Sequence, residues 1–232
     1  MNFRNKLKTI FIKWLLLFKY VFQFNLYKGI KFRIASNDEE LKKTYKLRYE
    51  VYCLEKGYLN PDNYPDKQEI DEFDKRSGTT NVIAIDKNNT IIGMIRIVPN
   101  DLYNSELPSE SYHSLKEYRK YNKSIAELSR FIISKVYRKN IKIYFGLVKG
   151  AMLYAKKYGI NNFCISVSTL FIDRYRIFGF KKVSGPYFYS KINHQYPSVT
   201  MCLNINKAAE SMNKMNPAFS KYLAKENSEI EI

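Results

Sequence analysis

The chain contains few of the residues that cross-link small proteins or bind metals. Its 232 residues include three cysteines and two histidines. An odd, sparse cysteine set predicts no disulfide framework, and the absence of a CxxC pair gives no sign of zinc. We therefore expect Cys53, Cys164 and Cys202 to be small semi-buried residues in a reducing compartment. His113 and His194 are far apart and His113 lies in a polar stretch, so we expect a solvated histidine and no metal site.

The chain also lacks a long uninterrupted apolar run. The best candidate lies within residues 1–32, where Lys13 and Lys19 interrupt it, whereas a membrane-spanning helix needs about 20 mainly apolar residues. No small-residue cleavage site follows, so we expect no signal peptide. We find no internal repeats. The length and the 45% share of apolar residues predict one globular domain with an extension.

Acidic residues are too few to balance the basic ones, and the net charge is +17. A chain of this charge attracts polyanions, which include nucleic acids, anionic membranes and acidic proteins. No helix-turn-helix, zinc-finger or RNP-like motif is present, so we expect no specific nucleic acid partner. A basic nucleic-acid-binding module remains an alternative to an enzyme, and salt-sensitive binding of unrelated DNA would favour it.

Residues 1–31 form a distinct basic segment. Seven basic and no acidic residues fall within residues 1–32. Apolar residues recur at helical spacing, namely Phe3, Leu7, Ile10, Trp14, Leu17 and Val21. This pattern predicts an amphipathic helix over residues 1–25 that lies on an anionic membrane surface. The alternative is a helix packed against the protein's own core or in a dimer. We expect residues 32–206 to form the main domain and residues 207–232 a polar, partly frayed tail.

The main domain shows alternating strand and helix patterns. A capping-box pattern at Ser36 and Glu39 predicts the start of a helix that ends near Gly57. We expect residues 100–123 to be a polar, mobile stretch. Expected strands cover 31–35, 79–85, 90–98, 125–134, 162–167, 183–192 and 199–205, and further helices cover 141–158 and 170–178. The order predicts an α/β fold with a mixed sheet and helices on both faces.

Charged residues interrupt two of the expected strands. Arg96 lies in the apolar run 91–97, and Glu127 and Arg130 lie together in the strand over 125–134. A charge in a central strand is unfavourable unless it is paired. We therefore expect one network, in which arginines balance carboxylates from four segments: Arg48, Arg96 and Arg130 with Glu69, Asp71, Asp74 and Glu127. The alternative is that these residues face solvent along one polar face of each strand.

Four of these segments together resemble a known enzyme family. The string LRYEVYCLEKGY over residues 47–58 resembles N-acyl amino acid synthases and exosortase-associated acyltransferases. The string EIDEFD over residues 69–74 resembles the acidic motif shared with acyl-homoserine-lactone synthases. GMIR over 93–96 and ELSR over 127–130 follow in the same order, and residues 136–187 are similar to the second half of a GNAT fold. The resemblance covers residues 32–205.

The resemblance implies a GNAT-like N-acyltransferase that transfers a long-chain acyl group from a phosphopantetheine thioester to a small amine. No permanently bound cofactor is implied. Glu127 would take the proton of the attacking amine, and backbone N–H groups of a splayed strand would stabilise the oxyanion. We assign a catalytic role to Glu127, Arg130, Asp71 and Asp74. We assign acceptor binding to Arg48, Glu69, Arg96 and Ser129.

Two departures from the family pattern refine the expected substrates. The stretch 136–141 has no glycine, whereas acetyl-CoA-dependent GNATs have a Gly-rich loop there for the pyrophosphate. This favours acyl carrier protein over acyl-CoA as the donor. Lactone synthases have a tryptophan between the arginine and the acidic motif, but the only tryptophan here is Trp14. This favours an amino acid or related amine as the acceptor, with a homoserine-lactone synthase as the alternative.

Basic residues are expected to bind the carrier protein where the phosphopantetheine arm would enter. They surround the start of the helix over 141–158, and the alternative is a merely solvated basic face. The set is Lys135, Arg138, Lys139, Lys142 and Lys149. Such an enzyme would be cytoplasmic and peripheral on the inner face of the cell membrane. An inactive acyltransferase fold at the membrane is a further alternative.

Two further expectations concern individual side chains. Glu127 and Arg130 are three residues apart on one strand, so they should project to opposite faces unless a bulge intervenes. Arg130 would then support Glu127's pocket, or Asp71 and Asp74, from the side. Three tyrosines either line an acyl tunnel or pack in the core, namely Tyr175, Tyr187 and Tyr189.

Overall fold

The computed structural model describes residues 29–100, 106–176, 178–188, 196–208, 210, 220–222 and 229–232. The expected amphipathic helix over residues 1–25, together with Tyr189 and His194, lies outside these described residues. Among the helices that the structure describes, none combines the length and the apolar character needed to span a membrane.

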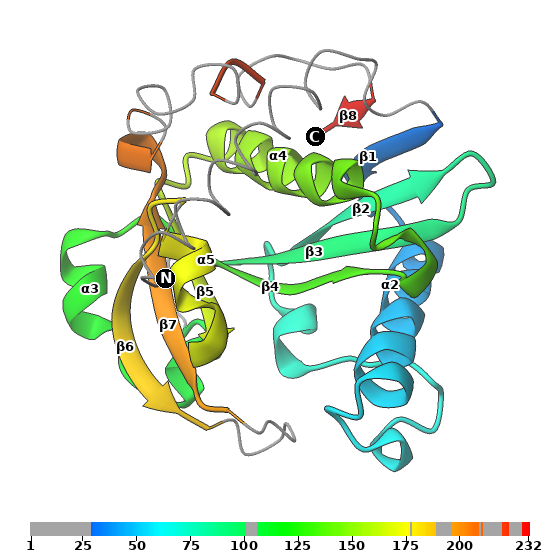
Figure 1. Ribbon diagram of the computed structural model, residues 1–232, viewed down its shortest axis with the longest axis horizontal. Helices are drawn as coiled ribbons and strands as arrows, with labels where there is room; N and C mark the ends of the chain where they lie inside the picture. Colours follow the sequence, from blue (N-terminus) through cyan, green and yellow to red (C-terminus); the bar gives the residue numbers. More distant parts are fainter. Residues whose placement is uncertain are drawn as a thin grey trace, which may run out of the picture.

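The centre of the fold is an eight-stranded mixed sheet with the order β6-β7-β5-β4-β3-β2-β1-β8 (Figure 1). β4 and β5 are parallel, as are β1 and β8, and the other neighbours are antiparallel. The strands are β1 (Ile30–Ile34), β2 (Thr80–Asp86), β3 (Ile91–Pro99), β4 (Ile125–Ile133), β5 (Asn162–Ser168), β6 (Lys181–Tyr187), β7 (Ser198–Asn204) and β8 (Ile230–Glu231). The expected α/β class with a mixed sheet is confirmed.

Helices cover both faces of the sheet. α4 (Ile141–Lys157) lies on one face, and α2 (Asp38–Tyr49) lies on the other (Figure 1). α2 continues directly into a π-helical turn, Glu50–Glu55, and such turns often occur at functional sites. The described residues also include two short α-helices, α3 (Lys116–Tyr121) and α5 (Ile172–Arg176).

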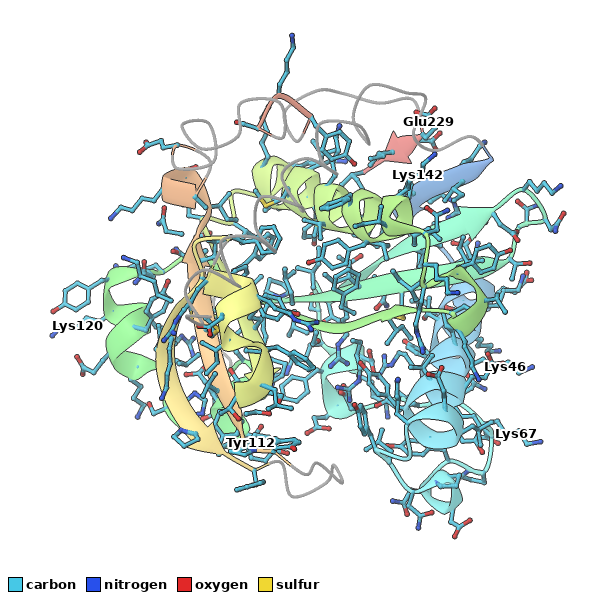
Figure 2. All side chains as sticks on the ribbon, viewed as in Figure 1. Lys46, Lys67, Tyr112, Lys120, Lys142 and Glu229 are labelled. Carbon is cyan, nitrogen blue, oxygen red and sulfur yellow. A yellow bond between two sulfur atoms is a disulfide. The ribbon has the colours of Figure 1, made fainter. Side chains whose placement is uncertain are left out.

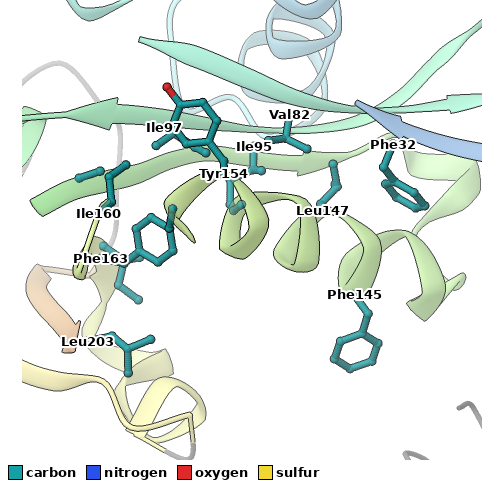
Figure 3. Close-up of a cluster of buried hydrophobic side chains, with 14 of the residues drawn as sticks. Phe32, Val82, Ile95, Ile97, Phe145, Leu147, Tyr154, Ile160, Phe163 and Leu203 are labelled. Atoms are coloured by element: carbon teal, nitrogen blue, oxygen red, sulfur yellow. The ribbon is translucent and has the colours of Figure 1, made fainter. Parts of the chain in front are cut away.

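The alternation of side chains along β2 creates two cores. Val82 and Ala84 belong to the cluster under α4, whereas Ile83 and Ile85 belong to the cluster under α2. Figure 3 shows Phe32 and Val82 in the layer between α4 and the strands. Gly146 allows this close packing, because an added Cβ would lie 2.1 Å from the Phe32 ring. Burying a side chain such as Phe32 contributes roughly 1.5–3 kcal/mol to stability.

Several expected boundaries need correction. The cap of α2 is Asn37, not Ser36, and its side chain accepts a hydrogen bond from the backbone N–H of Glu40. The stretch expected to be mobile instead contains α3 and buries Leu107 and Leu115 against the sheet. Apolar residues in a polar stretch can become buried when they pack against apolar side chains of neighbouring strands that would otherwise be exposed.

The expected frayed tail also contributes to the sheet. Ile230–Glu231 forms β8, which pairs in parallel with β1 at Phe32 and Arg33. Ile230 is buried in the main core. A two-residue strand gives no periodic signal, so only the pairing with β1 defines it.

The expectation that the cysteines are unbridged is wrong for two of them. Cys164 on β5 and Cys202 on β7 form a disulfide, and Cys53 is free and buried. The two residues are 38 positions apart, but antiparallel pairing places them directly opposite each other. The expected reducing compartment rested on the absence of such a bridge, so it loses that support.

Candidate active site

The site begins where β4 and β5 separate. The two parallel strands are paired from Ile125 with Asn162 to Leu128 with Ile165, and no pairing follows. Beyond this point the backbone groups facing the gap have no partner on the other strand. Ser129 on β4 and Ser166 on β5 are the first residues after the split. The gap therefore offers main-chain donors next to an opening in the sheet.

Two cavities meet at this split. One, of about 680 Å³, is mainly apolar and lies beside α4, with Phe131, Tyr144 and Phe163 in its wall. The other, of about 700 Å³, lies beside the π-helical turn and contains Glu69, Asp71 and Glu127. Both volumes fall within the range of small-molecule sites. The residues shared by both walls are Tyr52, Leu128, Ser129, Arg130, Phe131 and Ser166.

Six of the expected charges form a closed ring beside the polar cavity. The order is Arg48, Glu69, Arg130, Asp71, Arg96, Asp74 and back to Arg48. Arg48 holds Asp74 through two hydrogen bonds of 2.7 and 2.9 Å, and Arg96 holds Asp71 through two of 2.6 and 2.9 Å. The three positive and three negative charges cancel. Such bidentate contacts fix the geometry of both partners.

The ring keeps Glu69 and Asp71 ionised. Burial disfavours the charge on Glu69, but Arg130 and Arg48 outweigh it and hold its pKa at about 2. Burial also opposes ionisation of Asp71, and hydrogen bonds from Arg96 with the charges of Arg96 and Arg130 hold its pKa well below the usual value. Ser129 joins the ring because its Oγ accepts a 3.0 Å hydrogen bond from Arg96 Nε.

A bulge in β4 orients Arg130. Two steps along β3, from Met94 to Arg96, match three steps along β4, from Ile132 to Ser129. Arg130 has φ 51°, in the left-handed region that non-glycine residues rarely adopt. The bulge brings Arg130 to the cavity that also contains Glu127. The expectation of opposite faces held only without a bulge, and the bulge at Arg130 means that this condition is not met.

Glu127 does not belong to the ring, although it was expected there. Its side chain is almost completely buried, and its Oε2 accepts a 2.9 Å hydrogen bond from the backbone N–H of Ser109. Burial raises its pKa to about 7, against the opposing effect of the Ser109 hydrogen bond. A carboxylate with this pKa can take up and release a proton near neutral pH, as a general base must. In one cavity, therefore, Glu69 and Asp71 stay ionised near neutral pH, whereas Glu127 exchanges a proton there.

The sequence missed several residues of the site. Ser109 acts through its backbone, which no residue pattern reports. Tyr52 lies in the π-helical turn, where Arg130 Cζ is 5.4 Å from its ring centre, and its place in the LRYEVY string was an available signal. His113, expected to be solvated, is half-buried, and its Nε2 lies 3.0 Å from Thr200 Oγ1. Tyr175 lines the apolar cavity.

The expected carrier-binding set is only partly exposed. Lys135 and Lys139 are exposed and Lys142 is half-buried near the start of α4. Arg138 pairs with Glu55 and also donates to the carbonyl of Ile133. Lys149 does not belong to this surface, because it is fully buried and its Nζ donates to the carbonyl of Tyr222 at 2.7 Å. The segment that contains Tyr222 covers Lys149, and helical periodicity does not report a contact with a residue 73 positions later in the chain.

Among the described residues, no group of three or more histidine, cysteine, aspartate or glutamate side chains could hold a metal ion. The carboxylates are instead occupied by arginines. A split between two parallel strands, with an apolar cavity on one side and an ionisable polar cavity on the other, is the arrangement of a GNAT-type N-acyltransferase.

Comparisons with known proteins agree with this class. The model of the family N-acyl amino acid synthase FeeM matches residues 43–204. The chain belongs to this family of acyltransferase enzymes. No curated protein matches the chain by sequence.

Solved structures with this fold include FeeM, an N-acyl amino acid synthase from uncultured soil microbes. The identity is 18% over 78% of this chain and 93% of that one, with a TM-score of 0.63. The CoA-dependent acyl-homoserine lactone synthase BjaI, solved with SAM and isopentyl-CoA, is 16% identical over 81% of this chain and 89% of its own, with a TM-score of 0.59. The lactone synthase LasI is 17% identical over 81% and 95%, also with a TM-score of 0.59.

Proposed function

We propose that this acyltransferase moves a long-chain fatty acyl group from acyl carrier protein to the amine of an amino acid or a related small amine. The observation that carries the proposal is the meeting of two cavities at the β4–β5 split. The apolar cavity suits an acyl chain. The polar cavity, with Glu127 and the charge ring, suits a small zwitterionic acceptor. The thioester carbonyl would lie between them.

Glu127 is the proposed general base. An amino acid carries a protonated amine near neutral pH and cannot attack until it loses a proton. Glu127, with a pKa of about 7, accepts that proton directly or through water. The neutral amine nitrogen then bonds to the carbonyl carbon and the carbon–sulfur bond breaks. The second proton lost by the nitrogen goes to the departing thiolate.

The charge ring orients the acceptor rather than exchanging protons. Glu69 and Asp71 remain ionised at neutral pH, so they are poor acids. Arg130 is the partly exposed arginine of the ring, with 19% of its side chain accessible, whereas Arg48 and Arg96 are buried. Arg130 is therefore placed to bind an acceptor carboxylate while Glu69 and Asp71 hold it.

Acyl carrier protein is the proposed donor, and the start of α4 supports this. Asn140 caps the helix, and its side chain accepts from the backbone N–H of Lys142 at 3.1 Å. That donor is already occupied, and no glycine within residues 136–141 allows a close approach of pyrophosphate. The exposed Lys135 and Lys139 suit an acidic carrier.

The proposed location is the inner face of the cell membrane, bound through residues 1–25. This segment is outside the described residues, and the support is its basic amphipathic sequence. A long-chain N-acyl product dissolves poorly in water, so an enzyme at the membrane could release it into lipid.

The test is expression in a bacterial host, followed by mass spectrometry of lipid extracts. The full-length chain should produce long-chain N-acyl amino acids, and the Glu127→Gln variant should not. N-acyl-homoserine lactones as the only products would reassign the acceptor and favour the alternative function. The absence of any acylated amine in several hosts would contradict the proposal.

A further inference from the structure

Four side chains from separate elements form a hydrogen-bonded chain that ends at the split. His113 Nε2 lies 3.0 Å from Thr200 Oγ1 on β7, which lies 3.1 Å from the Tyr187 hydroxyl on β6. The Tyr187 hydroxyl is in turn hydrogen-bonded to Ser166 Oγ on β5. The His113 ring also lies against the Tyr187 ring, with centres 4.7 Å apart. The proposed reaction so far uses none of these groups.

The direction of this chain follows from His113. Its Nδ1 is buried and has no hydrogen-bond partner in the described part of the molecule. An unpaired lone pair is less unfavourable there than an unpaired N–H, so we assign the proton to Nε2. Nε2–H then donates a hydrogen bond to Thr200 Oγ1. The single hydroxyl proton of Thr200 is donated in turn to the Tyr187 hydroxyl.

The same logic fixes the hydroxyl of Ser166. In this arrangement Tyr187 accepts from Thr200, and we assign its own single proton to Ser166 Oγ. The Ser166 proton cannot point back at Tyr187 and must be donated elsewhere. Ser166 lines both cavities and is the first β5 residue after the pairing with β4 ends. Its O–H is therefore available to a group bound in the opening where the cavities meet.

We propose that Ser166 is a side-chain donor for the oxyanion of this reaction. As the amine attacks, electrons move to the thioester oxygen, and Ser166 O–H donates a hydrogen bond to it without losing its proton. When the oxyanion collapses, the thiolate leaves. Tyr187, Thr200 and His113 are positioning residues that act through Ser166. This inference rests on the proposed N-acyltransferase function.

The first test is steady-state kinetics of the purified full chain. Tetradecanoyl-acyl carrier protein serves as the donor and an equimolar mixture of the twenty protein amino acids as the acceptor. Ser166→Ala should lower kcat about 10²-fold, the usual effect of removing one oxyanion donor, and leave the KM for the donor unchanged. Ser124→Ala is the matched control, because its hydroxyl bonds to the Gly159 carbonyl and lies outside both cavity walls.

The second test separates positioning from a purely structural role. Tyr187→Phe should lower kcat in the wild-type background and have almost no further effect in Ser166→Ala, because it acts only through that hydroxyl. Tyr118→Phe is its control, since that hydroxyl contacts Asn162 at 3.5 Å instead. His113→Gln keeps an amide N–H donor and should retain more activity than His113→Leu.

Each outcome decides between the two proposals. If the wild-type protein forms no acylated product with this mixture, the assumed substrates are wrong and the proposed function fails. If wild-type turnover is present and folded Ser166→Ala matches it, Ser166 is not an oxyanion donor. If Ser166→Ala does not fold, Tyr187→Phe decides, and wild-type kcat in that variant overturns the inference. Additive losses in the double variant overturn the positioning roles.

Discussion

Glu127 and Arg130 line the same cavity although they are three residues apart on one strand. The bulge at Arg130, with φ 51°, breaks the regular alternation of side chains between the two residues, and both line this cavity. A left-handed residue other than glycine costs about 1–3 kcal/mol. The ion pairs of Arg130 with Glu69 and Asp71 hold it in place. One irregular backbone position thus brings the base and the charge ring together.

Replacing Glu127 by glutamine should remove the base without changing the shape of the side chain. We expect kcat to fall about 10²-fold or more. In the wild-type protein, kcat/KM should rise with pH up to about 7 and then level off, because the ionised form of Glu127 is the active one. Initial rates across pH 5–9 measure both effects. A variant that keeps wild-type turnover would exclude Glu127 from the mechanism.

The same substitution should stabilise the fold at high pH. The pKa of Glu127 is raised above its ordinary value of 4.5, so the folded state binds a proton more tightly than the unfolded state. The stability of the wild-type protein should therefore decline from pH 4.5 to about 7, and glutamine avoids this loss. We expect Glu127→Gln to be more stable at pH 8 by roughly 3 kcal/mol, since each unit of pKa difference between the folded and unfolded states corresponds to about 1.4 kcal/mol. Urea unfolding at pH 5 and pH 8 provides the comparison.

Breaking the charge ring should be far more destabilising than breaking a surface ion pair. Glu69→Gln removes one of the three carboxylates, so Arg48 keeps only Asp74, Arg130 keeps only Asp71, and one positive charge of the ring is uncompensated. The substitution should cost about 3–5 kcal/mol at pH 7. Glu39→Gln, which removes the exposed pair with Lys43, should change stability by less than about 0.5 kcal/mol. Denaturant unfolding measures both. A loss below about 1 kcal/mol for Glu69→Gln would show that solvent reaches the ring.

The acid dependence of stability offers a second measurement on Glu69. Its pKa is depressed from 4.5 to about 2, so its contribution is fully present above pH 4.5 and disappears as pH falls towards 2. The wild-type protein should lose stability across this window. Glu69→Gln should show a flatter profile, and an equally steep one would assign the acid sensitivity to other groups.

The basic residues near the start of α4 provide a test of carrier docking. Lys139→Glu with Lys142→Glu should raise the KM for acyl carrier protein, and the effect should shrink as salt increases. Lys120→Glu on α3 is the control, because Lys120 and Lys142 lie on opposite sides of the molecule (Figure 2). An unchanged KM in the double variant would mean that the carrier docks elsewhere.

Residues 1–25 should bind anionic membranes. Basic residues next to anionic lipid contribute about 1 kcal/mol each, and the apolar face of the segment adds to this. Full-length protein should sediment with anionic vesicles, and a chain starting at Lys31 should sediment much less. If truncation unfolds the protein and leaves binding unchanged, the segment belongs to the core instead.

The sequence alone determined the order of the helices and strands and the charged residues that are available to the site. Alternating residues in β2 and the 3.6-residue repeat in α4 reflect which faces are buried, and burial is a local constraint on each residue. Arg96 and Arg130 stood out because charges inside strands require partners. The family resemblance rests on the same strings.

Tertiary structure alone decided which of these groups meet. Glu127 lies beside Ser109 rather than in the ring, Cys164 faces Cys202, and Lys149 is buried, because strand pairing and helix packing set these distances. The bulge at Arg130 depends on contacts with residues about 60 positions earlier in the chain. A sequence pattern reports what surroundings each residue requires. Which residues far apart in the chain become its partners is decided only when the strands pair and the helices pack.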